Sequence, residues 1–232
     1  MTKVVLVPGF TQTASSWDGV RGILDATCDV VALDVPVRET FGATADAIAA
    51  RGQRAVYVGY SMGGRLCLRL ALDHPHLVPG LVLVSATPGI VDDATRRARV
   101  ASDEQLASSI ERDGVDAFLE RWLAQPLFAT VPPDAPGLAE RALLPARHLT
   151  HCLRVLGTGV MEPMWAELTD LTMPVALVTG TLDRSYEVIA AQMVGRIGSR
   201  AEHARLEGGH SLPLEQPAAL AGFIGAFAAE HG

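Results

Sequence analysis

The sequence predicts an α/β fold: a mostly parallel, doubly wound sheet covered by helices on both faces. Short, uninterrupted apolar runs such as residues 4–7 recur along the chain, which is typical of strands that are buried on both faces. Segments with helical periodicity lie between most of these runs, and alternating strands and helices build a parallel sheet. The length of 232 residues is sufficient for one such fold with a large core.

The strands and helices are predicted from these two patterns in turn. The clearest apolar runs cover residues 4–7, 30–33, 55–58, 81–84 and 175–178. Residues 201–206 form a weaker sixth candidate, because their pattern is less apolar. The helical patterns cover residues 16–24, 44–50, 62–72, 186–197 and 217–229.

One long segment interrupts the alternation. Residues 92–168 contain no convincing strand and are dominated by helical patterns, with a proline-rich break at residues 131–136. We interpret this segment as a helical cap inserted into a core formed by residues 1–91 and 169–232. Ligands of open α/β sheets bind at the carboxyl ends of the strands, so we expect the cap to cover the binding site.

Composition excludes several classes of protein. The net charge of −7 argues against a general nucleic-acid or anionic-membrane partner, and no apolar stretch is long enough to span a bilayer. The first residues hold too short an apolar run for a signal peptide. Cys28, Cys67 and Cys152 are widely spaced and form no metal-binding pattern, so we expect reduced thiols and a cytoplasmic protein. The sequence contains no clear stripe of apolar residues that would indicate an interface between subunits, so it does not predict an oligomeric state.

A serine lies between two glycines where a predicted strand meets a predicted helix. The sequence Gly59-Tyr60-Ser61-Met62-Gly63 is a G-x-S-x-G motif. Between a strand and a helix, this motif forms a sharp turn that holds the serine hydroxyl at the edge of the sheet. The small residues on either side allow the strand and the helix to approach closely. The motif therefore predicts Ser61 as a catalytic residue rather than as part of a plain glycine-rich turn.

A reactive serine requires a base and an acid that orients the base, and in this context they follow it in the order acid, then histidine. Of seven histidines, His210 alone lies after the last predicted strand and before the last predicted helix. Asp183 follows the strand at residues 175–178 and is expected at the same edge of the sheet, whereas Asp170 precedes that strand. The alternative role for Asp183 is to cap the N-terminus of the helix that follows it, rather than to orient the histidine.

Backbone amides are expected to complete the site as an oxyanion hole. The amide after the nucleophile belongs to Met62, and the turn after the first strand offers the amide of Phe10. Gly9 permits that turn, whereas Pro8 has no backbone N–H to donate.

These residues resemble the α/β-hydrolase superfamily over essentially the whole chain. Further motifs are similar to those of the 2-succinyl-6-hydroxy-2,4-cyclohexadiene-1-carboxylate synthases, a family of menaquinone biosynthesis. The motifs that carry this closer resemblance are residues 59–65, 85–90, 96–99, 102–103, 118–122, 125–128 and 156–159.

The resemblance implies a lyase that eliminates pyruvate from 2-succinyl-5-enolpyruvyl-6-hydroxy-3-cyclohexene-1-carboxylate. It implies that Ser61, activated by His210 and Asp183, abstracts a ring proton while the oxyanion hole holds the charge on the succinyl carbonyl. It also implies that no cofactor or metal is needed. The substrate contacts that it assigns are Tyr60, Arg65, Arg99, Trp122 and Arg147.

The arginines also predict a small anionic substrate on physical grounds. Arg65 lies one turn after Ser61, near a helix N-terminus where the helix dipole disfavours a cation, and a bound carboxylate would compensate. A guanidinium group also suits bidentate carboxylate binding. Each of these residues also has an interpretation without a substrate contact. Arg65 could be solvated or paired with an acid, Arg99 could lie on a solvated helix face, and Trp122 could belong to the core of the cap.

Three functions remain open from the sequence. The first is the lyase, and the second is a hydrolase that uses the same serine on an ester, a lactone or a carbon–carbon bond. A hydrolase of small neutral esters has no need of several arginines. The third is a ligand-binding protein without catalysis, against which the intact serine, histidine and aspartate argue.

Overall fold

The computed structural model describes residues 1–232 and contains one six-stranded sheet in the order β2-β1-β3-β4-β5-β6. All neighbouring strands are parallel, which confirms the predicted fold class. The strands are β1 (Thr2–Val7), β2 (Cys28–Ala32), β3 (Val56–Tyr60), β4 (Leu81–Val84), β5 (Val175–Gly180) and β6 (Ala201–Leu206). The weak candidate at residues 201–206 is therefore a strand at one edge of the sheet.

Helices connect the strands and fill the segment without strands. The α-helices are α1 (Asp18–Leu24), α2 (Phe41–Gly52), α3 (Met62–Asp73), α4 (Asp93–Asp113), α5 (Val115–Leu123), α6 (Ala146–Leu156), α7 (Arg184–Ile197), α8 (Leu212–Glu215) and α9 (Pro217–His231). Short 3₁₀ helices are η1 (Ala14–Trp17), η2 (Pro75–Leu77), η3 (Pro126–Phe128), η4 (Glu140–Leu143) and η5 (Glu167–Asp170). None of these helices has both the length and the apolar composition that a membrane crossing requires.

Several helices differ from their predicted limits by one to three residues, and two of these differences have clear local reasons. The helix expected from residue 16 is divided, because residues 14–17 form η1 and the α-helix begins at Asp18. Helix α2 begins three residues earlier than predicted. The Thr40 hydroxyl accepts a hydrogen bond of 3.1 Å from the amide of Ala43 and thereby caps the helix at this earlier start.

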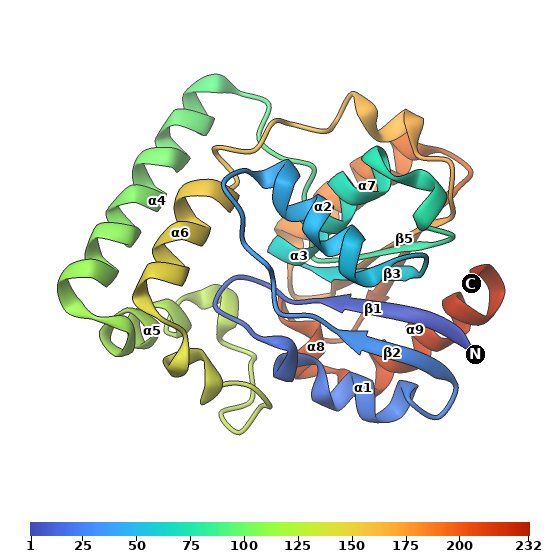
Figure 1. Cartoon of the computed structure of the whole chain (residues 1–232), viewed down its shortest axis with the longest axis horizontal. Helices are drawn as coiled ribbons and strands as arrows, with labels where there is room; N and C mark the ends of the chain where they lie inside the picture. The colour runs from blue at the N-terminus through green and yellow to red at the C-terminus, as the bar shows by residue number, and fades with distance from the viewer.

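Each face of the sheet has its own apolar core. Successive residues of a strand point to opposite faces, so Val4 and Leu6 pack with α1 and α9, whereas Val5 and Val7 pack with α2, α3 and α7. Figure 1 shows the two helical layers on either side of the sheet. Burial on both faces explains why the central strands read as continuous apolar runs rather than as alternating patterns.

Residues 92–168 contain no strand and have a small core of their own. Ala107 and Ile110 of α4, Phe118 and Leu119 of α5, and two leucines of α6 form this cluster. Arg154 of α6 also forms salt bridges with two glutamates of α4. Figure 1 shows α4, α5 and α6 together at one side of the sheet. The division of the chain into a core and a cap stays a prediction.

Candidate active site

The turn between β3 and α3 holds Ser61 in an unusual backbone conformation. Its φ of 51° is a left-handed value that costs a residue other than glycine free energy, and such strain is found most often at functional sites. A Cβ on Gly63 would lie 2.2 Å from the carbonyl oxygen of Val7, and one on Gly59 would lie 2.4 Å from that of Gly63. The two glycines are therefore required for the close approach of strand and helix, as the sequence predicts.

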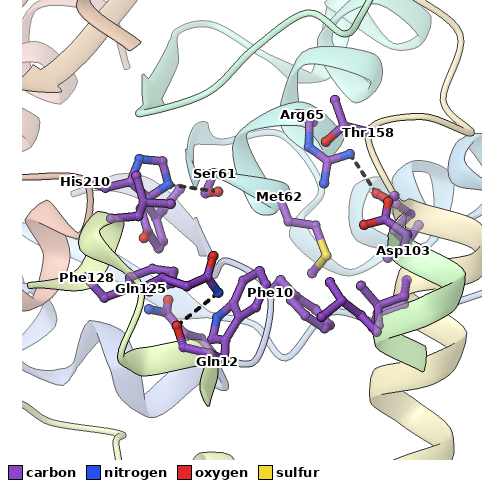
Figure 2. A pocket seen from close by; sticks show the side chains of 18 of the residues that line it. Phe10, Gln12, Ser61, Met62, Arg65, Asp103, Gln125, Phe128, Thr158 and His210 are labelled. Carbon is purple, nitrogen blue, oxygen red and sulfur yellow. Dashed lines mark hydrogen bonds between the residues drawn. The ribbon is translucent and has the colours of Figure 1, made fainter. Parts of the chain in front are cut away.

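The structure brings the three side chains of the predicted triad together. The Nε2 atom of His210 lies 3.3 Å from the Oγ atom of Ser61 (Figure 2). Its Nδ1 atom lies 2.6 Å from Oδ2 of Asp183. Asp183 precedes α7, but its side chain makes no capping hydrogen bond, so it is available to the histidine. This arrangement has the geometry in which an imidazole accepts a proton from a serine.

Aromatic rings enclose His210. The ring of Tyr186 lies 4.6 Å from the imidazole between centroids, and the rings of Tyr60 and Phe128 lie at 5.5 and 6.3 Å. Because the imidazole is only 2% exposed, it is shielded from water. No other histidine lines the pocket, and His203 is instead hydrogen-bonded to Thr179 within the sheet.

The amides of Phe10 and Met62 are available beside the serine. The amide of Phe10 has no acceptor in the protein, whereas the preceding amide of Gly9 donates to the side chain of Gln12. Met62 is the first residue of α3, so its amide has no acceptor inside the helix. Both residues line the same pocket as Ser61, and their amides are suited to stabilise a developing oxyanion.

The pocket has a volume of about 280 Å³ and extends from Ser61 to the helices of residues 92–168. Figure 2 shows Ser61 and His210 on one side, Arg65 and Asp103 on the other, and Met62 between them. Ser61 and the charged side chains of the pocket therefore face one volume.

Arg65 and Arg99 contribute positive charge to this pocket. Arg65 is 7% exposed, and its Nη1 atom donates to the carbonyl oxygen of Leu156 at 2.7 Å. Burial lowers the pKa of Arg65 to about 10, so the guanidinium is still charged at neutral pH. Arg99 donates from Nε to Oδ1 of Asp103 at 2.8 Å. Arg65 itself has no salt-bridge partner, which excludes the acid-paired alternative for that residue.

The expected role of Arg147 requires a correction. Arg147 lies on the exposed face of α6 with His151 and Arg154, which follow it at helical spacings of four and seven residues, and it does not line the pocket. The arginine of this segment that does line the pocket is Arg141 of η4. The helical spacing of Arg147, His151 and Arg154 indicates a polar outer face for Arg147, whereas no pattern indicates that Arg141 faces inward, because it belongs to a short turn whose direction depends on tertiary packing.

Arg141 is a buried cation without an acidic partner. It is 1% exposed, and its Nη1 atom donates to the hydroxyl of Thr11 at 3.3 Å. Its Nε and Nη2 atoms have no hydrogen-bond partner, and burial lowers the pKa of the guanidinium. Buried charges are normally paired, so this site has an unsatisfied preference for an anion or another acceptor.

Tyr60 and Trp122 line the pocket mainly through their rings. The hydroxyl of Tyr60 is hydrogen-bonded to Oγ of Ser211 at 2.8 Å. Trp122 packs edge-to-face on Phe10 with a centroid separation of 5.3 Å, and its buried indole N–H has no partner. Trp122 thus belongs both to the apolar cluster of α4, α5 and α6 and to the pocket wall.

No individual role is predicted from the sequence for several polar residues that line the pocket. Asp103, Gln125 and Thr158 lie within motifs that carry the family resemblance, whereas Gln12, Arg141 and Tyr186 lie outside those motifs. The last three come from separate segments of the chain, so no spacing in the sequence connects them. No cluster of three or more histidine, cysteine, aspartate or glutamate side chains is placed to hold a metal ion.

Comparisons with known proteins agree with the fold. The model of the alpha/beta hydrolase family matches residues 4–223. The chain is 33% identical over 165 residues to a putative 2-succinyl-6-hydroxy-2,4-cyclohexadiene-1-carboxylate synthase of Bacillus subtilis (strain 168). This alignment covers 69% of the chain but 60% of the relative, so the chain matches less than two thirds of that protein.

Solved structures show the same fold. MenH from S. aureus superposes with a TM-score of 0.89 at 23% identity, over 99% of this chain and 94% of the other. A thermophilic esterase from Thermogutta terrifontis superposes with a TM-score of 0.80 at 19% identity, over 100% and 91% of the two chains. The parallel sheet, the strained serine turn and the family match together establish that this chain belongs to the α/β-hydrolase family.

Proposed function

We propose that the chain is a carbon–oxygen lyase that eliminates pyruvate from 2-succinyl-5-enolpyruvyl-6-hydroxy-3-cyclohexene-1-carboxylate. The product is 2-succinyl-6-hydroxy-2,4-cyclohexadiene-1-carboxylate, the compound after which the B. subtilis relative is named. The observation that carries the proposal is the charge of the pocket: three arginines and one aspartate face the volume beside Ser61. A substrate with several carboxylates suits this excess of positive charge.

The proposed chemistry uses Ser61 as the base and needs no covalent intermediate. His210 takes the hydroxyl proton of Ser61, and Asp183, which contacts Nδ1, stabilises the imidazolium that forms. The serine oxygen then removes the ring proton at C2, and the electrons of the broken C–H bond form the C2–C3 double bond. The existing C3–C4 double bond shifts to C4–C5, and its electrons displace the enolpyruvyl group by breaking the C5–O bond. The leaving enolate takes up a proton and becomes pyruvate.

Two backbone amides support this reaction. As the ring proton leaves, negative charge spreads to the neighbouring succinyl carbonyl. Phe10 and Met62 line the pocket beside Ser61, and their amides, which have no acceptor in the protein, are the proposed hydrogen-bond donors to this oxygen. The removal of one such donor in other enzymes costs about 10²–10³ in kcat.

The arginines are proposed to bind the carboxylates of the substrate. Arg65 and Arg99 lie across the pocket from Ser61, and Arg141 replaces Arg147 as the third candidate. Since Arg65 and Arg141 have no acidic partner in the protein, a carboxylate bound there gains a charge-assisted hydrogen bond without breaking an ion pair. Trp122 and Tyr60 supply apolar contacts to the ring.

The alternative is a serine hydrolase of an ester, a lactone or a carbon–carbon bond. Two observations favour this alternative: the same three side chains suit acyl transfer, and the fold is also that of an esterase. In that case Ser61 attacks a carbonyl carbon and forms an acyl-enzyme. A hydrolase of neutral esters leaves the buried charge of Arg141 without a function.

A direct comparison of two substrates tests the proposal. The enolpyruvyl substrate is generated in place by the preceding enzyme, and pyruvate is followed with a coupled dehydrogenase. In parallel, p-nitrophenyl acetate turnover is measured with the same enzyme preparation. The lyase predicts rapid pyruvate release and slow ester turnover. Rapid ester turnover without pyruvate release would instead identify the hydrolase.

Two variants make this comparison specific to the site. Ser61→Ala removes the proposed base, whereas Ser108→Ala removes an exposed hydroxyl on α4 and serves as the control. Pyruvate release that is lost in the first variant and retained in the second supports the proposal. Binding of the substrate with turnover of neither compound would indicate a ligand-binding protein.

A further inference from the structure

We infer that Glu215 is a positioning residue that holds the backbone on both sides of His210. The inference rests on the proposed use of His210 but not on the identity of the substrate. Glu215 is the last residue of the short helix α8 and does not line the pocket. Its carboxylate acts on the histidine through the loop between β6 and α8.

The contacts of Glu215 are specific to the residues that flank the histidine. Its Oε2 atom accepts a hydrogen bond from the amide of Gly209 at 2.5 Å, and its Oε1 atom accepts one from the amide of Ser211 at 2.8 Å. Both amides belong to buried residues. A single carboxylate therefore fixes the peptide groups before and after His210, and each buried amide would otherwise lack an acceptor.

The loop is shaped to lie against this carboxylate. Gly208 has a φ of 137°, a conformation that side chains rarely adopt. A Cβ on Gly209 would lie 2.3 Å from Oγ1 of Thr130 and 3.2 Å from Oε2 of Glu215. The Gly208-Gly209 pair thus allows the backbone to pass between residue 130 and the carboxylate.

The neighbouring serine cannot replace Glu215 in this role. The hydroxyl of Ser211 is hydrogen-bonded to Tyr60 at 2.8 Å and makes no capping contact with α8. Glu215 accepts a hydrogen bond from the Ser211 amide, and it lies one residue beyond the position that the glutamate of a capping box occupies. The loop is then held at two points, by Tyr60 through the Ser211 hydroxyl and by Glu215 through two amides.

The position of the imidazole depends on this loop. Asp183 orients the ring through Nδ1, but the distance from Nε2 to the Ser61 hydroxyl is already 3.3 Å, near the limit of a hydrogen bond. A small displacement of the backbone at residue 210 would break this contact. We therefore expect Glu215 to affect the reactivity of Ser61 without any contact with a ligand.

The test measures the rate at which Ser61 is labelled by a fluorophosphonate, which requires an activated serine but no natural substrate. Glu215→Ala is expected to lower the labelling rate per folded molecule at least about tenfold, because an active-site displacement well below 1 Å already removes the hydrogen bond. Glu207→Ala removes an exposed carboxylate from the same loop and is expected to label at the wild-type rate.

Two further measurements separate positioning from a loss of folding. Near-ultraviolet circular dichroism gives the folded fraction, and Glu215→Gln keeps one oxygen acceptor for one of the two amides. The Gln variant is expected to label at a rate between those of the wild type and the Ala variant. If the Ala variant does not fold, the Gln variant decides the question in the same assay. With any substrate that is turned over, kcat is expected to fall while KM stays unchanged.

Clear results would overturn the inference. Wild-type labelling rates in a folded Glu215→Ala protein, or in Glu215→Gln where the Ala variant does not fold, show that the loop holds His210 without the carboxylate. A wild-type protein that is not labelled has no activated serine for Glu215 to support. Absence of pyruvate release together with slow labelling of the Glu215 variants would reject the lyase and leave this inference standing.

Discussion

Asp103 accepts a hydrogen bond of 2.8 Å from Nε of Arg99 and is the one acidic side chain that lines the pocket. The contact uses a single carboxylate oxygen and the Nε position of the guanidinium, so the two terminal nitrogens of Arg99 remain available to a ligand. The other oxygen, Oδ2, is buried without a partner. Burial is the largest influence on this carboxyl group and raises its pKa, against the opposing effect of Arg99.

The first prediction concerns Asp103→Asn. A raised pKa means that the folded protein disfavours the ionised form, so the stability contributed by this group is present below the unfolded pKa of about 4 and is lost as the pH rises through the folded value. Asparagine does not ionise. We therefore expect a Tm at pH 7 equal to or above that of the wild type, with the difference shrinking towards pH 4. Differential scanning calorimetry across this range measures it.

The same variant is expected to lose activity. Asparagine accepts a weaker hydrogen bond from Arg99, so the guanidinium is less well oriented and KM for an anionic substrate should rise about threefold or more. A variant that is less stable at every pH, with unchanged KM, would show that Asp103 is a structural residue alone.

Arg65→Lys should raise KM rather than lower kcat. Lysine keeps the positive charge but loses the planar guanidinium, which donates to Leu156 and faces the pocket. We expect KM to rise by about tenfold, because a charge-assisted hydrogen bond contributes about 1.5–3 kcal/mol. Steady-state kinetics measure the change, and Arg51→Lys on the exposed side of α2 is the control. Equal kinetics for both variants would exclude a substrate contact at Arg65.

Gly63→Ala tests the close approach of strand and helix. The new Cβ would lie 2.2 Å from the carbonyl oxygen of Val7, so the helix must move, and we expect a loss of about 1–3 kcal/mol in the free energy of unfolding. Gly22→Ala in α1 has no atom within 4 Å of the new Cβ and should gain about 0.5–1 kcal/mol. Urea unfolding measures the free energy of unfolding of both variants. Equal changes in the two would contradict the close approach of strand and helix at Gly63.

The cysteines are expected to be unreactive in the folded protein. Cys28, Cys67 and Cys152 are all buried free thiols. Burial raises the pKa of Cys67, and it raises that of Cys152 to about 12, so few thiolates exist at about pH 8. Ellman's reagent should label none of the three quickly in the native state and all of them in guanidinium chloride. Fast native labelling of Cys28 or Cys67, which do not line the pocket, would show that the interior opens more readily than the structure indicates.

The parts of the site that the sequence predicts are those that the fold places by topology. Ser61, Asp183 and His210 follow three different strands of a parallel sheet, and the carboxyl ends of such strands meet at one edge. Glycines at the serine turn could also be predicted, since only small residues allow so close an approach. Chain order and local sterics are therefore enough to find these residues.

The parts that the sequence does not predict depend on packing in irregular segments. Arg141 lies in a 3₁₀ turn, and nothing in its local sequence shows that it faces inward, although the spacing of Arg147, His151 and Arg154 on α6 does indicate an outer face for Arg147. The contacts of Asp103 require α4 to lie over the pocket. Glu215 acts on amides that come near it only because the glycine pair turns the loop back. Each of these contacts is set by tertiary structure rather than by periodicity.

The rate of pyruvate release by Ser61→Ala, measured with saturating enolpyruvyl substrate, tests the central claim most directly. A positioned base contributes about 10²–10⁴ to the rate, so the variant should retain at most about 1% of the wild-type kcat while still binding the substrate. A variant that releases pyruvate at the wild-type rate would contradict the account, because the strained turn that presents this hydroxyl would then have no part in the reaction.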